Sequence, residues 1–316
     1  MPWIHYLPDK QKVEVDPDET VLQASLRARI PHAHACGGNA RCSTCRVQII
    51  EGLPNCQPPD LNEQKLAERL HLNCEVRLGC QMHITGDVTL RRLLRDAEDV
   101  EISAGITKSE GPVSLGEEKT VAILFADIRN FTAFAESQPA YDVIYVLNRY
   151  FHEMGRIIQR RGGYIDNYMG DGLIALFGVD ESRHAAKRAI QAGFEMLRSV
   201  KKMSAFLQEI YSAPLEIGIG IHYGQAIVGS IGAKEKKRMT AIGDAVNLAS
   251  RIEAATKTCD ASILVSEAAL RAVRSSVRIE KKYSNVHLKG KSGSHTLYEI
   301  AGFRSRKKPA KMGTAA

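Results

Sequence analysis

The sequence predicts an α+β fold in two domains, because short apolar strands alternate with longer apolar helices on both sides of one polar break. The chain has 316 residues, of which 44% are hydrophobic, enough to build two packed cores. Between about Arg95 and Lys119 the apolar pattern gives way to acidic residues, glycines and a proline, as is typical of a domain boundary. We therefore expect a first domain at 1–95, a linker at 96–117, a second domain at 118–303 and a basic tail at 304–316.

The first domain opens with short strands at Trp3–Leu7 and Lys12–Asp16, joined by a turn at Pro8-Asp9. Thr20 is predicted to cap a helix that runs to Arg29 and buries one apolar stripe. A cysteine-containing loop follows, and after it a strand at Arg46–Glu51, a helix at Asn62–Leu70 and a closing strand near Asp87–Leu90.

Four of the seven cysteines have the spacing of a plant-type [2Fe–2S] cluster, namely Cys36, Cys42, Cys45 and Cys80. Such a cluster takes three thiolates from one tight loop and the fourth from a distant segment. Gly37 and Gly38 suit this loop, since backbone that turns its amides toward cluster sulfurs needs angles that a Cβ disfavours.

Two other uses of the cysteines are weaker. A zinc site usually has two Cys-x-x-Cys pairs, whereas Cys42 and Cys45 form the single such pair of this sequence. Disulfides are disfavoured, because neither a signal peptide nor a long apolar segment marks the chain for export. Cys56, Cys74 and Cys259 are expected to be free thiols.

Residues 1–95 as a whole resemble [2Fe–2S] ferredoxins, a resemblance that implies a β-grasp fold. The five residues between Cys36 and Cys42 exceed the four of plant ferredoxins and are similar to the adrenodoxin-like subgroup.

The second domain opens on a buried strand, Thr120–Ala126, which ends at Asp127 and runs into a helix start. A carboxylate followed by free helix amides is suited to a metal and phosphates. A hairpin is predicted at Gly163–Tyr168 and Leu173–Phe177, with Asp171 at its tip. Two long amphipathic helices are predicted at Tyr141–Arg160 and Glu181–Tyr211.

A further helix is predicted to begin near Gly243. On it Asn247 and Arg251 are four residues apart and share one face, where an amide and a guanidinium would suit a ribose and a phosphoryl group. Taken alone, an aspartate at a hairpin tip such as Asp171 is more often only a turn residue, and a pair such as Asn247 and Arg251 is more often part of a solvated helix face.

Together these motifs, with Phe125-Ala126-Asp127-Ile128-Arg129-Asn130-Phe131-Thr132, resemble the catalytic domain of class III nucleotide cyclases over residues 118–301. The resemblance implies a ferredoxin-like βαββαβ core, a fold unrelated to the iron–sulfur domain, and a homodimer with shared active sites. It also implies roles for individual residues: two Mg²⁺ ions on Asp127, Asp171 and the Ile128 carbonyl, ribose orientation by Asn247, and α-phosphate stabilisation by Arg251. Lys289 and the amides of Ile128, Arg129, Asn130, Phe131 and Thr132 would bind the triphosphate.

The base-reading positions that the resemblance implies are Asn167 and Thr240. Thr240 agrees with many bacterial adenylyl cyclases, whereas Asn167 replaces the lysine expected there. An asparagine amide donates to adenine N1 or accepts from guanine N1–H, so ATP is expected with relaxed selectivity.

The net charge of +7 comes largely from the tail, where Arg304, Arg306, Lys307, Lys308 and Lys311 lie within 13 residues. A disordered tail is expected, and binding to nucleic acid or anionic lipid is disfavoured. No apolar run reaches the roughly 20 residues that span a bilayer, so a cytoplasmic protein is expected.

Two hypotheses of different classes remain. The first is a homodimeric adenylate cyclase regulated or stabilised by a [2Fe–2S] domain, which would also need an electron donor as a partner. Guanylate or dual specificity is a variant of it. The second is a redox carrier whose cyclase-like domain only dimerises, although the intact set of Asp127, Asp171, Asn247 and Arg251 argues against it. A diguanylate cyclase is excluded by the hairpin tip, which lacks that family's signature.

Overall fold

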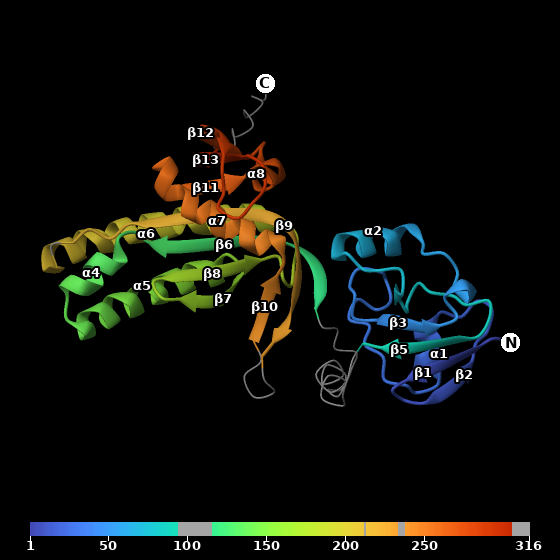
Figure 1. Cartoon of the computed structure of the whole chain (residues 1–316). Coiled ribbons are helices and arrows are strands. Elements are labelled where there is room, and N and C mark those ends of the chain that lie inside the picture. The colour runs from blue at the N-terminus through green and yellow to red at the C-terminus, as the bar shows by residue number, and fades with distance from the viewer. Residues whose placement is uncertain (94–115, 212, 233–237, 305–316) are drawn as a thin grey trace, which may run out of the picture. The chain divides into compact units, whose positions relative to one another are not determined.

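The computed structural model describes residues 1–93, 116–211, 213–232 and 238–304, and the chain divides into two compact units, Met1–Gly116 and Glu117–Ala316 (Figure 1). The expected linker (96–117) and tail (304–316) lie almost entirely outside the described residues. Each unit is described by itself.

The N-terminal unit is a five-stranded sheet of order β2-β1-β5-β3-β4, packed against α1. β1 pairs parallel with β5, and the other pairs are antiparallel. Its core contains Ile4, Tyr6, Val47, Met82 and Leu90. The elements are β1 (Trp3–Leu7), β2 (Gln11–Glu14), α1 (Val21–Arg27), β3 (Arg46–Glu51), η1 (Leu53–Asn55), α2 (Leu61–Leu70), β4 (Val76–Leu78) and β5 (Val88–Arg92).

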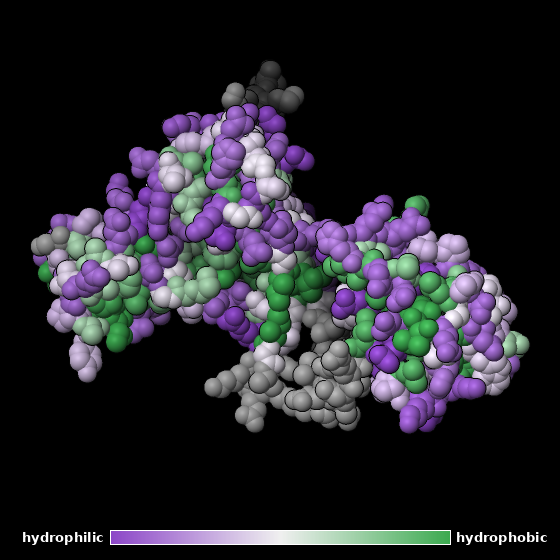
Figure 2. Space-filling model, viewed as in Figure 1, coloured by the Kyte–Doolittle hydropathy of each residue, from purple (hydrophilic) through white to green (hydrophobic). Residues whose placement is uncertain are grey.

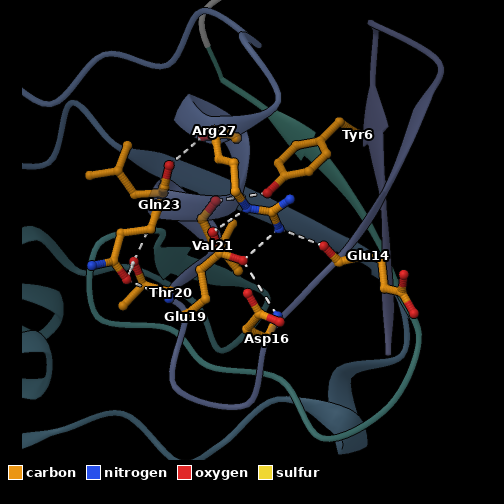
Figure 3. Close-up of polar contacts among 10 residues, drawn as sticks. Tyr6, Glu14, Asp16, Glu19, Thr20, Val21, Gln23 and Arg27 are labelled. Atoms are coloured by element: carbon orange, nitrogen blue, oxygen red, sulfur yellow. Dashed lines mark hydrogen bonds and ion pairs between the residues drawn. The ribbon is translucent and has the colours of Figure 1, made fainter. Parts of the chain in front are cut away.

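Helix α1 is fixed at both ends by polar contacts (Figure 3). Thr20 caps it as predicted, since its hydroxyl accepts from the Gln23 amide while the Gln23 side chain accepts from the Thr20 amide. Arg27 donates to Glu19 and to the Glu14 carbonyl, which joins the end of the helix to β2. The predicted helix end at Arg29 is wrong by two residues, because Arg29 has a left-handed φ of 57° that a helix does not continue through.

The C-terminal unit is an eight-stranded sheet of order β12-β13-β11-β9-β6-β8-β7, with β10 added to β9. The chain order β6-α5-β7-β8-α6-β9 gives the expected βαββαβ core. Its strands are β6 (Glu117–Ile128), β7 (Gly163–Met169), β8 (Gly172–Phe177), β9 (Ile217–Ile231), β10 (Arg238–Ile242), β11 (Ile263–Ser266), β12 (Val277–Val286) and β13 (His295–Phe303). Its helices are α4 (Phe131–Ser137), α5 (Ala140–Arg160), α6 (Ala185–Tyr211), α7 (Asp244–Cys259) and α8 (Glu267–Val273).

Strand β6 separates two cores. Ala122, Leu124 and Ala126 face the cluster formed with α5 and α6, while Val121 and Phe125 face the cluster formed with β10 and α7. By the same alternation Asp127 lies on the α7 face. The predicted helix start at Glu181 is wrong by four residues, since α6 begins at Ala185 behind His184, whose φ is 59°.

Candidate functional site

The predicted cysteine loop joins α1 to β3 and contains Cys36, Cys42 and Cys45, while Cys80 follows β4, and the four thiols lie in two pairs. Cys36 lies in hydrogen-bond contact with Cys42, and Cys45 with Cys80. Cys45 and Cys80 are buried, whereas Cys36 and Cys42 are half-buried. Gly37 and Gly38 have φ of 69° and 85°, the left-handed conformation that the sequence predicted for this loop.

Backbone amides of the loop point at the sulfurs. Burial alone would raise the pKa of Cys36, but the Arg41 amide, the Cys42 thiol and the amides of Asn39 and Cys42 together hold the pKa of this thiol below its ordinary value. Contact with Cys45, and further with Gln81 and the Ala40 amide, lowers the pKa of Cys80 to about 6 against its burial. Backbone amides thus contact Cys36, Cys45 and Cys80, and the four cysteines supply the thiolate donors that a [2Fe–2S] cluster takes, although no three metal-ligating side chains of the described residues are close enough together to hold a metal ion.

The segment that carries Cys80 is held from two sides. On one side, α1 donates its Leu22 amide to Gly79 and its Val21 amide to Met82. On the other, Glu63 of α2 accepts two hydrogen bonds of 2.9 Å from Arg77 and one of 2.7 Å from the Leu78 amide. Both charged side chains are buried, so this pair fixes β4 and with it the approach of Cys80.

In the C-terminal unit the two predicted aspartates lie together. Ala126 pairs with Leu173, which brings the end of β6 beside the β7–β8 hairpin tip, and Gly170 gives that tip its left-handed turn. Asp171 is in hydrogen-bond contact with Asp127; burial and then the Asp127 charge raise the pKa of the Asp171 carboxyl. An ideal Cβ on Gly172 would lie 3.0 Å from Asp127 Oδ1, so this position has little room for a larger residue. Adjoining, mutually repelling carboxylates are a fitting donor set for a hard divalent cation.

Helix α7 presents Asn247 and Arg251 on its exposed side, as predicted, but away from the aspartates of the same chain. The residue of α7 that reaches Asp127 is Lys257, with Nζ 3.6 Å from Oδ2. At about 1.5 Å rise per residue, Arg251 is roughly 9 Å and Asn247 roughly 15 Å back along the helix. Within one chain, therefore, the structure does not bring the two predicted halves of the site together.

The predicted phosphate loop follows β6. Asn130, with φ of 54°, precedes α4, whose first turn includes Phe131 and Thr132. Arg129 differs from the expectation. Its amide donates to the Glu216 carbonyl at 2.9 Å, and its guanidinium donates to the Ala261 carbonyl at 2.8 Å, near the end of α7. Arg129 is thus engaged in fixing this loop to its neighbours.

Thr240 is buried on β10, and Asn167 is half-buried on β7. The two strands contact one another, which agrees with one shared pocket for a base. Lys289 is exposed in the β12–β13 loop, and its neighbour Lys291 forms an ion pair with Asp244 at the start of α7.

Comparison with known proteins agrees with this geometry. Residues 113–302 match the adenylate and guanylate cyclase catalytic domain, and residues 4–85 match the 2Fe-2S iron-sulfur cluster binding domain. The chain belongs to the adenylate and guanylate cyclase family. Its fold is accordingly a [2Fe–2S] ferredoxin domain followed by a class III cyclase domain.

Two relatives define the extent of the likeness. An adenylate cyclase of Anabaena cylindrica is 35% identical over 212 residues, which cover 64% of this chain and 39% of that protein. The terminal-differentiation specific adenylate cyclase of Dictyostelium discoideum is 35% identical over 197 residues, which cover 61% of this chain and 9% of that protein. The chain thus matches less than half the length of either relative.

Two solved structures resemble the cyclase domain. The guanylyl cyclase Cya2 superposes with a TM-score of 0.56 at 32% identity and covers 63% of this chain and 99% of its own. The adenylyl cyclase CyaB from P. aeruginosa superposes with a TM-score of 0.55 at 30% identity, covering 60% and 97%. The likeness therefore extends equally to relatives named for either nucleotide.

Sequence reasoning missed several residues of the cyclase and iron–sulfur domains. Lys257, Glu253 and the Glu63–Arg77 pair carry no motif, and their roles depend on contacts between distant segments. Glu253 packs against β9, since an ideal Cβ on Gly218 would lie 3.0 Å from Glu253 Oε1. Burial, and next the Asp127 charge, raises the pKa of the Glu253 carboxyl to about 7. In the described parts of the chain, no helix is long and apolar enough to cross a membrane.

Proposed function

We propose that this protein is an adenylate cyclase, which converts ATP into 3′,5′-cyclic AMP and pyrophosphate at sites shared by two subunits. The observation that carries the proposal is the contact between the carboxylates of Asp127 and Asp171. Among the residues described, the cationic side chain paired with them is the exposed Lys257. In the reaction the ribose 3′-oxygen forms a bond to the α-phosphorus. The bond between the α-phosphorus and the oxygen that bridges to the β-phosphate breaks, so pyrophosphate leaves, and the hydroxyl proton passes to solvent.

Asp127, Asp171 and the Ile128 carbonyl would hold two Mg²⁺ ions. Bound there, Mg²⁺ lowers the pKa of the 3′-hydroxyl and offsets the charge of the triphosphate. The amides of Asn130, Phe131 and Thr132, with Lys289, would bind the β- and γ-phosphates. Asn247 would orient the ribose, and Arg251 would stabilise the charge that develops on the α-phosphate.

A shared site accounts for the distance between the aspartates and the Asn247–Arg251 pair. Exposed apolar side chains on the β9–β10 arm, Ile227, Ile231 and Ile242, support burial against a second copy, and Figure 2 shows hydrophobic residues along this arm. Mixing Asp127→Ala with Asn247→Ala protein tests this. Each is expected to be inactive alone, and mixed dimers regain activity because they hold one intact site. Lack of recovery despite demonstrated subunit exchange would contradict the shared site.

The activity itself is tested by incubating the purified chain with Mg²⁺ or Mn²⁺ and either ATP or GTP, then separating the products. Cyclic AMP is expected as the main product, and Asp127→Asn and Asp171→Asn proteins are expected to fold but form none. Cyclic GMP as the main product would support the guanylate alternative, with which the Asn167 amide is equally compatible because it can accept from guanine N1–H. Absence of both products would favour a redox carrier with a dimerising domain.

Cys36, Cys42, Cys45 and Cys80 are proposed as the ligands of one [2Fe–2S] cluster per chain. Iron and acid-labile sulfide in equal amounts are expected after anaerobic purification. Zinc in their place would contradict the proposal. We propose in addition that the redox state of this cluster regulates turnover, since the iron–sulfur and cyclase domains are fused in one chain.

A further inference from the structure

Strand β7 carries an irregularity beside the proposed base pocket. Ile165 pairs with Ala175 and Asn167 with the adjacent Ile174, so Asp166 is an extra residue, a β-bulge. Bulges redirect side chains, and they recur next to active sites.

The bulge changes which side chains share a face. An ideal Cβ on Gly155 of α5 would lie 3.3 Å from Ile165 Cδ1 and 3.7 Å from the Tyr168 hydroxyl, so both side chains face α5. Residues three apart point to opposite faces of a regular strand. The extra residue absorbs this difference and leaves Asp166 and Asn167 together on the opposite face.

That opposite face is the one turned to β10. Tyr164 packs there against the cluster that includes Ala241. The Asp166 side chain contacts the Thr240 hydroxyl; burial raises the pKa of the Asp166 carboxyl, and this contact lowers it. Among the described residues Asp166 Oδ1 is buried with no hydrogen-bond partner, so this oxygen is free to accept a hydrogen bond. Thr240 is only 8% exposed.

A threonine hydroxyl has one proton to donate and two lone pairs to accept with. A carboxylate only accepts, so Asp166 directs the Thr240 proton toward itself and leaves lone pairs facing the pocket. Those lone pairs accept a hydrogen bond from the 6-amino group of adenine, and they meet the 6-oxygen of guanine with no proton to donate.

We propose that Asp166 is a positioning residue for base selection, which fixes Thr240 as an acceptor and so makes the site select a 6-aminopurine nucleotide. The proposal rests on the nucleotide cyclase function proposed above and deepens it. It also supplies the selectivity that Asn167 lacks, because the Asn167 amide satisfies adenine N1 and guanine N1–H equally well.

The first test uses the unaltered protein and two substrates that differ at one group, ATP and purine riboside triphosphate, which lacks the 6-amino group. We expect kcat/KM to be roughly three- to tenfold higher for ATP, as one ordinary hydrogen bond provides. Equal values would overturn the proposal. If no nucleotide is turned over, the proposed function fails, and competition of the two triphosphates for a bound fluorescent ATP analogue still decides the inference.

The second test is Asp166→Ala, with Asp180→Ala, an exposed aspartate of the same domain, as the matched control. Without the Asp166 carboxylate the Thr240 hydroxyl is free to rotate and should either donate or accept. The ratio of kcat/KM for ATP to that for purine riboside triphosphate, and to that for GTP, should therefore fall roughly three- to tenfold. In a Thr240→Val background the same change should have no further effect on either ratio. Unchanged ratios in a folded, active Asp166→Ala protein would overturn the proposal. If that variant does not fold, the ratio of the two substrates on the unaltered protein decides the inference.

Discussion

The ammonium of Lys257 lies 3.6 Å from the carboxylate of Asp127, so a side chain of α7 takes the place beside this aspartate where a metal ion is proposed to bind. Lys257 is 54% exposed and Asp127 is 31% exposed. An exposed ion pair of this kind contributes little to stability and is readily displaced.

Replacing Lys257 should therefore make the site easier to load. In Lys257→Gln protein no ammonium competes for Asp127 or repels a bound cation, so half-maximal activity should need roughly two- to threefold less Mn²⁺ or Mg²⁺, the change expected for an exposed charge pair. Metal titration of initial rates measures this. Lys282→Gln, at an exposed position of β12, is the control. A higher metal requirement in Lys257→Gln would mean that Lys257 assists binding.

Glu253 should make stability depend on pH. Its folded-state pKa of about 7 lies above its ordinary value of 4.5, chiefly through burial. The folded protein therefore holds this proton more tightly than the unfolded chain, and stability falls as pH rises from 4.5 through about 7.

Glu253→Gln removes that loss, so without divalent metal its melting temperature should exceed that of the parent at pH 8 and approach it at pH 5. Melting followed by far-UV circular dichroism measures the difference. Glu280→Gln, at an exposed position of β12, is expected to follow the parent throughout. A Glu253→Gln protein that melts lower at pH 8 would show that the charged form is favoured in the fold.

The buried pair of Glu63 and Arg77 should stabilise the iron–sulfur domain. In Glu63→Gln protein the Arg77 guanidinium is left buried without its counter-charge, a loss of about 3–5 kcal/mol. Urea unfolding, followed by the visible absorbance of the cluster, should move to lower concentration. The matched control is Glu68→Gln, since Glu68 is exposed on the same helix. Equal midpoints for the two variants would contradict a stabilising role.

What the sequence could predict depended on how local the determining contacts are. The thiol loop, the hairpin tip and the cap of α1 follow from residues close in the chain, and their positions in the structure agree with the motifs. Lys257 meets Asp127 only because α7 packs on β6, and the bulge at Asp166 depends on pairing with β8. No spacing rule within one strand or helix contains such information, so tertiary packing had to supply it.

The last prediction concerns the proposed link between cluster and turnover. Reduction adds one negative charge to the cluster, and if this changes nucleotide affinity, binding a nucleotide must shift the reduction potential by the same free energy. A coupling of about 1–3 kcal/mol corresponds to a 5- to 150-fold change in affinity and, for one electron, to roughly 40–130 mV. Redox titration of the visible spectrum, with and without a non-hydrolysable ATP analogue and Mg²⁺, measures the shift directly. Asp127→Asn protein is the control, because impaired metal–nucleotide binding should abolish the shift while the cluster remains. Titration curves that superimpose, together with equal turnover in the oxidised and reduced protein, would restrict the cluster to stabilising its own domain or passing electrons elsewhere.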